Sequence, residues 1–195
     1  MRFLTNIFPE DEIKRKSFHL LILLYIAAYW LLPYKLVMTA MGVLLALVLA
    51  GEVLRLKSPA FNDFILKLLG GVHREGEKDK VSGLPWTLSG SYATMLVFHD
   101  KKIVIACLLF LTFGDTAAAL FGKSFGRHKI AFEKTLEGTF ACFVVCFLIG
   151  LAFFDFKVAV LAALAMSVIE LIPWPLNDNF WIPFLTASVI TFTLK

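Results

Sequence analysis

LLFLTFGDTAAALFG, residues 108–122, is the stretch that decides the fold. The run is apolar enough to enter a lipid bilayer, yet it carries one carboxylate, Asp115. A carboxylate at that depth costs about 3 kcal/mol on insertion scales, so it is usually functional and has a partner. We expect a cationic partner from the basic, glycine-containing segment that follows. Its basic residues are Lys123, Arg127, Lys129 and Lys134.

The composition predicts an integral membrane protein. Of the 195 residues, 59% are hydrophobic and 17% charged, and the mean hydropathy is +0.79. A soluble domain of this length has no core large enough for so much apolar side chain. The three cysteines all fall within apolar runs, which argues against a disulfide framework and favours a packing role. No repeat or change of composition divides the chain, so we expect one membrane-embedded catalytic domain over residues 1–195.

Seven apolar runs reach or approach the roughly 20 residues that a helix needs to cross a bilayer. They lie at 17–33, 35–54, 84–98, 102–121, 135–154, 157–172 and 180–194, and the third and seventh are short. The predicted fold class is therefore all-α, a polytopic membrane bundle of about seven helices.

One further helix is predicted outside these runs, beginning at Ser58-Pro59. Serine caps helix starts, and proline suits the first helical position. Between 61 and 72, apolar residues recur at helical spacing on one face, and polar residues occupy the other. This pattern predicts an amphipathic helix on the cytoplasmic membrane surface, either a simple connector or a flap beside a lipid entrance.

Basic residues are distributed unevenly between the two sides of this topology. Most of the 19 lysines and arginines fall in the N-terminal segment and in the links at 55–83 and 122–134. The positive-inside rule places that side in the cytoplasm, with the N-terminus inside and the active site facing the cytoplasm. The other side has only Lys35, Lys101, Lys102, Lys157 and Lys195.

Polar residues within or beside the apolar runs also converge on the predicted inner face. Taken singly, each has an ordinary explanation, such as an i,i+3 ion pair between Glu52 and Arg55 or a snorkelling Lys134. Their convergence favours a single site. Besides Asp115, the set comprises Lys16, His19, Glu52, Arg55, Lys134, Glu137, Glu170, Asp178 and Asn179.

These residue types match what phosphoryl transfer requires. Asp115, Glu170 and Asp178 offer oxygen ligands, and Mg²⁺ prefers one or two carboxylates together with phosphate oxygens and water. Lysines and Arg127 can neutralise a triphosphate, while small residues let the backbone approach a ligand. Those small residues are Gly114, Gly122, Gly126 and Ala117 to Ala119.

A P-loop is excluded. Gly122-Lys123-Ser124 resembles the end of that motif, but position 117 is alanine and the segment follows a membrane helix instead of a strand.

The same residues carry a family resemblance. Gly114-Asp115-Thr116 with Gly122 and Gly126, followed by Lys134-Thr135-x-Glu137-Gly138, resembles the nucleotide site of the CTP-dependent lipid kinases. That family includes dolichol kinase, the CTP-using diacylglycerol kinase and phytol kinase. Other segments are similar to family motifs in the same order, from about residue 13 to 185. They are Arg15-Lys16-x2-His19, Glu52-x2-Arg55, Arg74 with Gly83 and Gly90, and Glu170 with Asp178-Asn179-x3-Pro183.

The resemblance implies transfer of the CTP γ-phosphate to a membrane alcohol such as a polyprenol, diacylglycerol or phytol. It implies that Asp115 holds Mg²⁺, that Lys134 binds phosphate, and that Asp178 and Asn179 complete the metal or nucleotide site. Glu170, Glu52 and Arg55 would order the site or position the hydroxyl, and no general base is assigned. The remaining predicted nucleotide contacts are Gly114, Thr116, Gly122, Lys123, Gly126, Arg127, Lys129, Thr135, Glu137 and Gly138, with Lys16, His19 and Arg74 in substrate-side or supporting positions.

Two alternatives stay open. Phe125-Gly126-Arg127-His128-Lys129 also resembles phosphatidate cytidylyltransferase, which attacks the α-phosphate, but the segment from Glu170 to Asn179 departs from that enzyme's C-terminal signature. An ion or lipid transporter is the non-enzymatic alternative, although its path should continue through the outer half, where polar residues are scarce. The expected partners are CTP, a lipid alcohol and the bilayer, without nucleic acid, and a homodimer is a further prediction.

Overall fold

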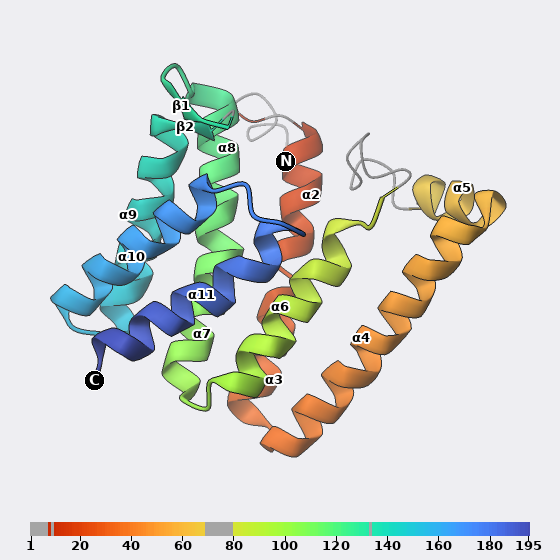
Figure 1. Ribbon diagram of the computed structural model, residues 1–195, viewed down its shortest axis with the longest axis horizontal. Helices are drawn as coiled ribbons and strands as arrows, with labels where there is room; N and C mark the ends of the chain where they lie inside the picture. Colours follow the sequence, from red (N-terminus) through yellow and green to blue (C-terminus); the bar gives the residue numbers. More distant parts are fainter. Residues whose placement is uncertain (1–7, 9, 69–79, 133) are drawn as a thin grey trace.

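The chain forms a helical bundle with one small hairpin, seen in a computed structural model that describes residues 8, 10–68, 80–132 and 134–195 (Figure 1). The strands are β1 (Lys129–Ala131) and β2 (Lys134–Thr135). The helices are α2 (Glu10–His19), α3 (Ile22–Leu31), α4 (Tyr34–Lys57), α5 (Pro59–Leu68), α6 (Gly83–Val97), α7 (Lys101–Leu109), the π-helical turn η2 (Phe110–Gly114), α8 (Asp115–Phe125), α9 (Leu136–Phe153), α10 (Phe156–Leu171) and α11 (Asp178–Thr193).

The hairpin corrects the all-α prediction. Strands β1 and β2 pair antiparallel, with Lys129 opposite Thr135. Phe132, between them, has a φ of +47°, a left-handed conformation that suits a tight turn. Two strands this short were not recognisable in the predicted loop 122–134, because they span too few residues to give an alternating pattern.

The predicted apolar runs are helical, but their lengths differ from expectation. In the part of the chain that the structure describes, three continuous helices are long and apolar enough to cross a membrane: Tyr34–Lys57, Lys101–Phe125 and Leu136–Phe153. The first predicted run, 17–33, is interrupted, because α2 ends at His19 and α3 begins at Ile22. Among the described residues the finding is therefore three candidate membrane-spanning helices, and about seven spans remains a prediction.

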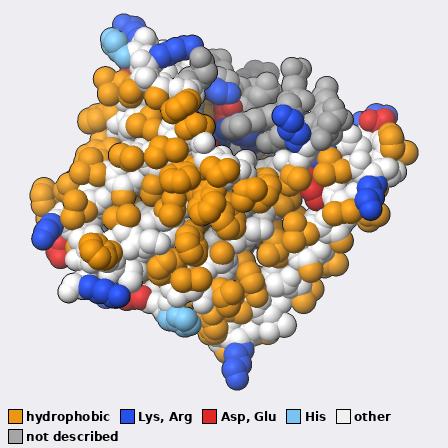
Figure 2. Space-filling view, in the orientation of Figure 1, with side chains coloured by type: hydrophobic (Ala, Val, Ile, Leu, Met, Phe, Trp, Pro, Cys, Tyr) orange, Lys and Arg blue, Asp and Glu red, His pale blue; other side chains and the backbone are white. Residues whose placement is uncertain are grey.

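The segment α7–η2–α8 forms the centre of the bundle. Helices α9 and α11 pack against it on one side and α3 on another (Figure 1). In α7, Val104, Ala106 and Cys107 are fully buried. In contrast, α4 lies at the edge and exposes many leucines. Hydrophobic side chains cover most of the face drawn in Figure 2, and charged side chains lie along its margins, as expected for a surface in contact with lipid.

Close packing of η2, α8 and α9 requires small residues at Gly114 and Gly138. A Cβ on Gly114 would overlap Cys146 Sγ, and one on Gly138 would lie 2.7 Å from the Ala118 carbonyl oxygen. These glycines therefore let α9 approach η2 and α8 closely. That approach brings β2 and the beginning of α9 beside Asp115.

Candidate active site

Charged side chains from distant segments meet at the end of the bundle that carries the hairpin, which we call the hairpin end. Two cavities lie there, of about 260 and 290 Å³. We call the first the α4-side cavity, because α4 and α5 form one of its walls, and the second the hairpin-side cavity, because β2 and α9 line it.

Asp115 lies where the two cavities meet. It is only 4% exposed and immediately follows the π-helical turn η2. Local π-helical turns occur often at functional sites. The Lys16 ammonium from α2 donates a hydrogen bond to Asp115 Oδ2, and His19 Nδ1 lies 3.7 Å from the same oxygen. The expectation of a cationic partner is therefore confirmed, but the side chain that hydrogen bonds to Asp115 lies 99 positions earlier in the chain, whereas Lys134, from the expected segment, lines the same cavity.

Lys134 joins two further carboxylates. It donates a hydrogen bond to Glu170 at the end of α10, and its Nζ lies 4.0 Å from Asp178 Oδ2 at the start of α11. Burial alone would lower the pKa of Lys134, but the adjacent Glu170 carboxylate outweighs it and raises the pKa above its ordinary value. The lysine is therefore a fixed positive charge at neutral pH.

The hairpin-side cavity combines cations with a helix N-terminus. Arg15, Lys123 and Lys134 line it together with Thr135 and Gly138 at the beginning of α9. Thr135 Oγ1 caps that helix by accepting a hydrogen bond from the Gly138 N–H at 3.3 Å. A helix N-terminus flanked by basic side chains favours anions, phosphate in particular.

Lys123 also ties α8 to α2, through a hydrogen bond to Glu12. Burial would raise the pKa of Glu12, but this contact and Arg15, whose Nη2 lies 2.7 Å from Glu12, lower it below its ordinary value. Glu12 therefore stays ionised at neutral pH and fixes Arg15 beside the cavity.

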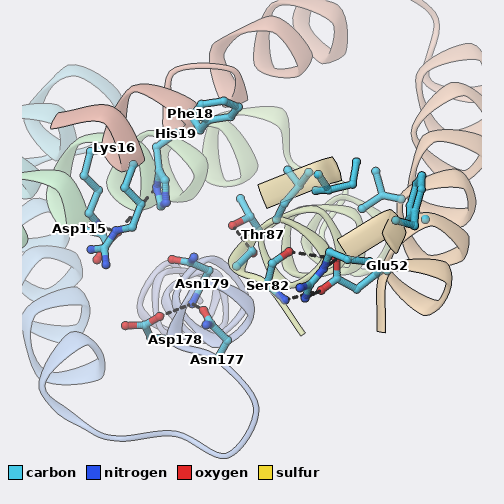
Figure 3. Close-up of a pocket in the computed structure, with 18 residues that line it drawn as sticks. Lys16, Phe18, His19, Glu52, Ser82, Thr87, Asp115, Asn177, Asp178 and Asn179 are labelled. Carbon is cyan, nitrogen blue, oxygen red and sulfur yellow. Dashed lines mark hydrogen bonds and ion pairs between the residues drawn. The ribbon is translucent and has the colours of Figure 1, made fainter. Parts of the chain in front are cut away.

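The α4-side cavity has a mixed lining. Phe18, Val48, Phe61, Ile65 and Leu84 supply apolar surface from α2, α4, α5 and α6. Figure 3 shows Lys16, His19 and Asp115 on one side of this cavity, with Glu52 and Ser82 on another and Asp178 and Asn179 between.

A polar network forms the α4 wall of that cavity. Arg55, 2% exposed, donates to Glu52 at 2.6 Å and to Asn62 of α5 at 2.8 Å. Glu52 in turn accepts a hydrogen bond from the Ser82 N–H at 2.6 Å. The i,i+3 pair is thus real, and it also fixes α5 and the beginning of α6.

The two cavities share Arg15, Asp115 and Asp178 in their linings. Ligands in the two cavities would therefore meet at these three side chains. The arrangement suits a reaction between an anionic ligand and a mostly apolar one.

Most predicted site residues line one of these cavities. In the hairpin-side cavity they are Asp115, Gly122, Lys123, Lys134, Thr135, Gly138, Glu170 and Asp178. In the α4-side cavity they are Lys16, His19, Glu52, Arg55, Asp115, Asp178 and Asn179.

Other predicted residues lie elsewhere. Thr116 Oγ1 bonds to the Thr112 carbonyl of its own helix, and Glu137 faces His128, with Oε1 2.7 Å from Nδ1. Arg74 falls outside the described residues. Those that line neither of the two cavities are Gly114, Thr116, Gly126, Arg127, Lys129 and Glu137.

Some lining residues were missed. Arg15 was part of a quoted motif, and its adjacency to Lys16 was an available signal. Phe132, Thr139 and Asn177 gave none, since lone aromatic and neutral polar residues are common in loops and at helix starts. Among the lining residues without a predicted role are Arg15, Phe132, Thr139, Ser82, Thr87 and Asn177.

Within the described ranges, no cluster of three or more His, Cys, Asp or Glu side chains could hold a metal by itself. The donor set nevertheless fits Mg²⁺ bound with a nucleotide, because Asp115 and Asp178 offer carboxylate oxygens to both cavities. Mg²⁺ is commonly bound by one or two carboxylates, with substrate phosphates and water completing the shell.

Comparison with known proteins found three curated relatives that share a name. The CTP-dependent diacylglycerol kinase 1 of Schizosaccharomyces pombe is 29% identical over 72% of this chain and 73% of its own length. The proteins of the same name from Eremothecium gossypii and Saccharomyces cerevisiae are 27% and 26% identical over 95% of this chain, and over 69% and 74% of their own lengths. No family model and no solved structure matches the chain.

Proposed function

We propose that this chain, which belongs with the CTP-dependent lipid kinases, transfers the γ-phosphate of CTP to the hydroxyl of a membrane lipid alcohol. The observation that carries the proposal is the pair of cavities that share Arg15, Asp115 and Asp178. One cavity suits a triphosphate, and the cavity beside it suits an alcohol with an apolar tail.

The triphosphate belongs in the hairpin-side cavity. Lys134, Lys123 and Arg15 supply positive charge there, and the N-terminus of α9 supplies backbone N–H groups. Lys134 is held by Glu170 and Asp178, so little reorganisation is needed when phosphate binds. Preorganised positive charge of this kind stabilises a phosphoryl-transfer transition state.

The lipid alcohol belongs in the α4-side cavity. Phe61 and Ile65 of the amphipathic helix α5 can contact its tail, while polar side chains surround the end near Asp115. This favours the flap interpretation of α5 over that of a simple connector.

The reaction takes place at the shared wall. The acceptor oxygen forms a bond to the γ-phosphorus, the bond from that phosphorus to the bridging oxygen breaks, and CDP leaves with the electron pair. The hydroxyl proton passes to water. Arg15 and Lys134 hold the phosphate oxygens, Asp115 and Asp178 would hold Mg²⁺, and Lys16 orients Asp115. Bound Mg²⁺ would neutralise charge on the β- and γ-phosphates.

Orientation in the membrane follows from the same proposal. CTP is a cytoplasmic nucleotide, so the hairpin end faces the cytoplasm and the N-terminus is inside, in agreement with the basic links. The chain then acts as a single catalytic domain whose remaining helices also cross the bilayer.

A labelling experiment tests the proposed function. Purified protein in detergent micelles is incubated with Mg²⁺ and CTP labelled at either the α- or γ-phosphate, with dioleoylglycerol, a polyprenol, phytol or dioleoyl phosphatidate as acceptor. We expect γ-label in lipid with at least one alcohol and no α-label. Transfer of α-label to phosphatidate would identify a cytidylyltransferase, and no transfer to any acceptor would contradict the kinase assignment.

A further inference from the structure

We propose that His19 Nδ1 accepts the hydrogen bond of the acceptor hydroxyl and so aims its oxygen at the γ-phosphate. This inference rests on the proposed kinase function and adds a substrate-contacting residue to it. His19 is only 8% exposed and lines the α4-side cavity beside Asp115.

The two ring nitrogens of His19 have different surroundings. Leu111, in the π-helical turn η2, lies beside the ring. Nδ1 is buried without a hydrogen-bond partner among the described residues, and it lies 3.7 Å from Asp115 Oδ2, too far to donate a hydrogen bond to it. We therefore assign the ring proton to Nε2, which leaves a lone pair on Nδ1.

That lone pair points to a missing donor. Nδ1 lies 3.7 Å from Asp115 Oδ2, and both atoms are hydrogen-bond acceptors. Two buried acceptors side by side are unfavourable unless a donor reaches them. Lys16 already donates a hydrogen bond to Asp115 Oδ2, so the acceptor that lacks a donor is His19 Nδ1.

The ribose hydroxyls of CTP would lie with the nucleotide in the hairpin-side cavity, so the hydroxyl donor that reaches His19 from the apolar side is that of the lipid alcohol. CTP phosphates are acceptors and would not satisfy Nδ1. A hydroxyl that donates to Nδ1 presents its oxygen lone pairs toward Asp115 and the shared wall. Figure 3 shows Lys16 and His19 projecting from α2 toward Asp115, and Asp115 lines both cavities.

The π-helical turn gives the arrangement its geometry. A π turn bonds residue i to i+5, so it alters the carbonyl directions of a continuous helix. Leu111, which lies beside the His19 ring, is one of the residues of η2. Sequence periodicity alone did not predict either the turn or the contact.

Three substitutions at His19 test the proposal, because side-chain amides mimic the two ring nitrogens separately. His19→Asn places an acceptor near the Nδ1 position, His19→Gln places its amide near the Nε2 position, and His19→Phe removes both. We expect His19→Gln and His19→Phe to lower kcat about 100-fold, the size of effect that misplacing a reacting group can produce. We expect His19→Asn to stay within tenfold of wild type, and the KM for CTP to stay within twofold in all three.

The assay uses the full chain, γ-labelled CTP and whichever alcohol from the panel the wild type phosphorylates. His99→Asn is the matched control, since His99 lies in the turn between α6 and α7 at the other end of the bundle. A second readout compares inhibition by the O-methyl ether of that alcohol, which cannot donate a hydrogen bond. If His19 accepts a hydrogen bond from the hydroxyl, the ether gains nothing from His19, and its inhibition constant is the same for the wild type and for His19→Gln.

Several results would overturn the inference while leaving the kinase function intact. Near-normal kcat in His19→Phe would do so, as would equal losses in the Asn and Gln variants. Loss of CTP binding in all three would assign His19 a structural role instead. Failure of the kinase proposal looks different, because the wild type would then transfer no γ-label to any alcohol.

Discussion

The two ends of the bundle use charged residues in different ways. At the end opposite the hairpin, Asp100 accepts from the Lys102 N–H at 2.8 Å and Asp155 from the Val158 N–H at 2.9 Å, so each caps the helix that it begins. At the hairpin end, Asp115 pairs with Lys16 across 99 positions, and Lys134 pairs with Glu170 across 36. Local capping explains the first group, whereas long-range pairs at a cavity indicate a ligand site.

The largest expected effect comes from replacing the aspartate at the hairpin end, with an aspartate at the opposite end as the control. Asp115→Asn should lower γ-phosphate transfer about 1,000-fold, because the variant loses the charge that would hold Mg²⁺ and orient Lys16. Asp155→Asn should leave transfer within twofold. The measurement is kcat with saturating CTP, and activity in Asp115→Asn close to wild type would remove Asp115 from the metal role.

Next in size is the buried network at the α4 wall. Arg55→Ala should lower the free energy of unfolding by about 3 kcal/mol, because the uncompensated Glu52 carboxylate remains in a mostly buried position. Lys57→Ala, on the exposed surface of the same helix, serves as control and should change stability little. Thermal unfolding in detergent tests both, and equal melting temperatures would contradict a structural role for the network.

One lysine at each end allows the same comparison. Lys134→Ala should lower kcat/KM for CTP about 100-fold, equivalent to about 2.7 kcal/mol, because phosphate loses a preorganised cation. Lys157→Ala, at the opposite end, should leave it unchanged. An unaltered kcat/KM for CTP in Lys134→Ala would exclude the phosphate contact.

The smallest effect concerns a cap. Asp155→Ala should destabilise the protein by about 1 kcal/mol, since the Val158 N–H loses its acceptor, while transfer per folded molecule stays normal. Parallel melting and activity measurements separate the two quantities. A loss of specific activity as large as that of Asp115→Asn would erase the distinction between the two ends.

The sequence predicted the helices well and their contacts only in part. Apolar runs located α4 and the long segment 101–125, because a helix that crosses a bilayer needs continuous apolar residues whether it faces lipid or the centre of the bundle. The family resemblance, based on local motifs, is confirmed by the three relatives. The sequence predicted a cationic partner for Asp115 but did not identify Lys16, since spacing along one helix cannot reveal which distant helix crosses it.

The glycines show the same limit. The motif predicted that they contact the nucleotide. In the structure Gly114 and Gly138 contact neighbouring helices, and Gly126 packs against Thr135. A small residue in a membrane helix permits close approach of either a ligand or another helix, and sequence does not distinguish the two.

The separation of the two substrates into neighbouring cavities is tested most directly by an experimental structure of the chain with Mg²⁺ and a non-hydrolysable CTP analogue. Our account predicts the triphosphate in the hairpin-side cavity, with Lys134 on its oxygens and the terminal phosphate beside Asp115. A triphosphate bound among Phe61, Ile65 and Glu52, or away from Asp115 altogether, would contradict it.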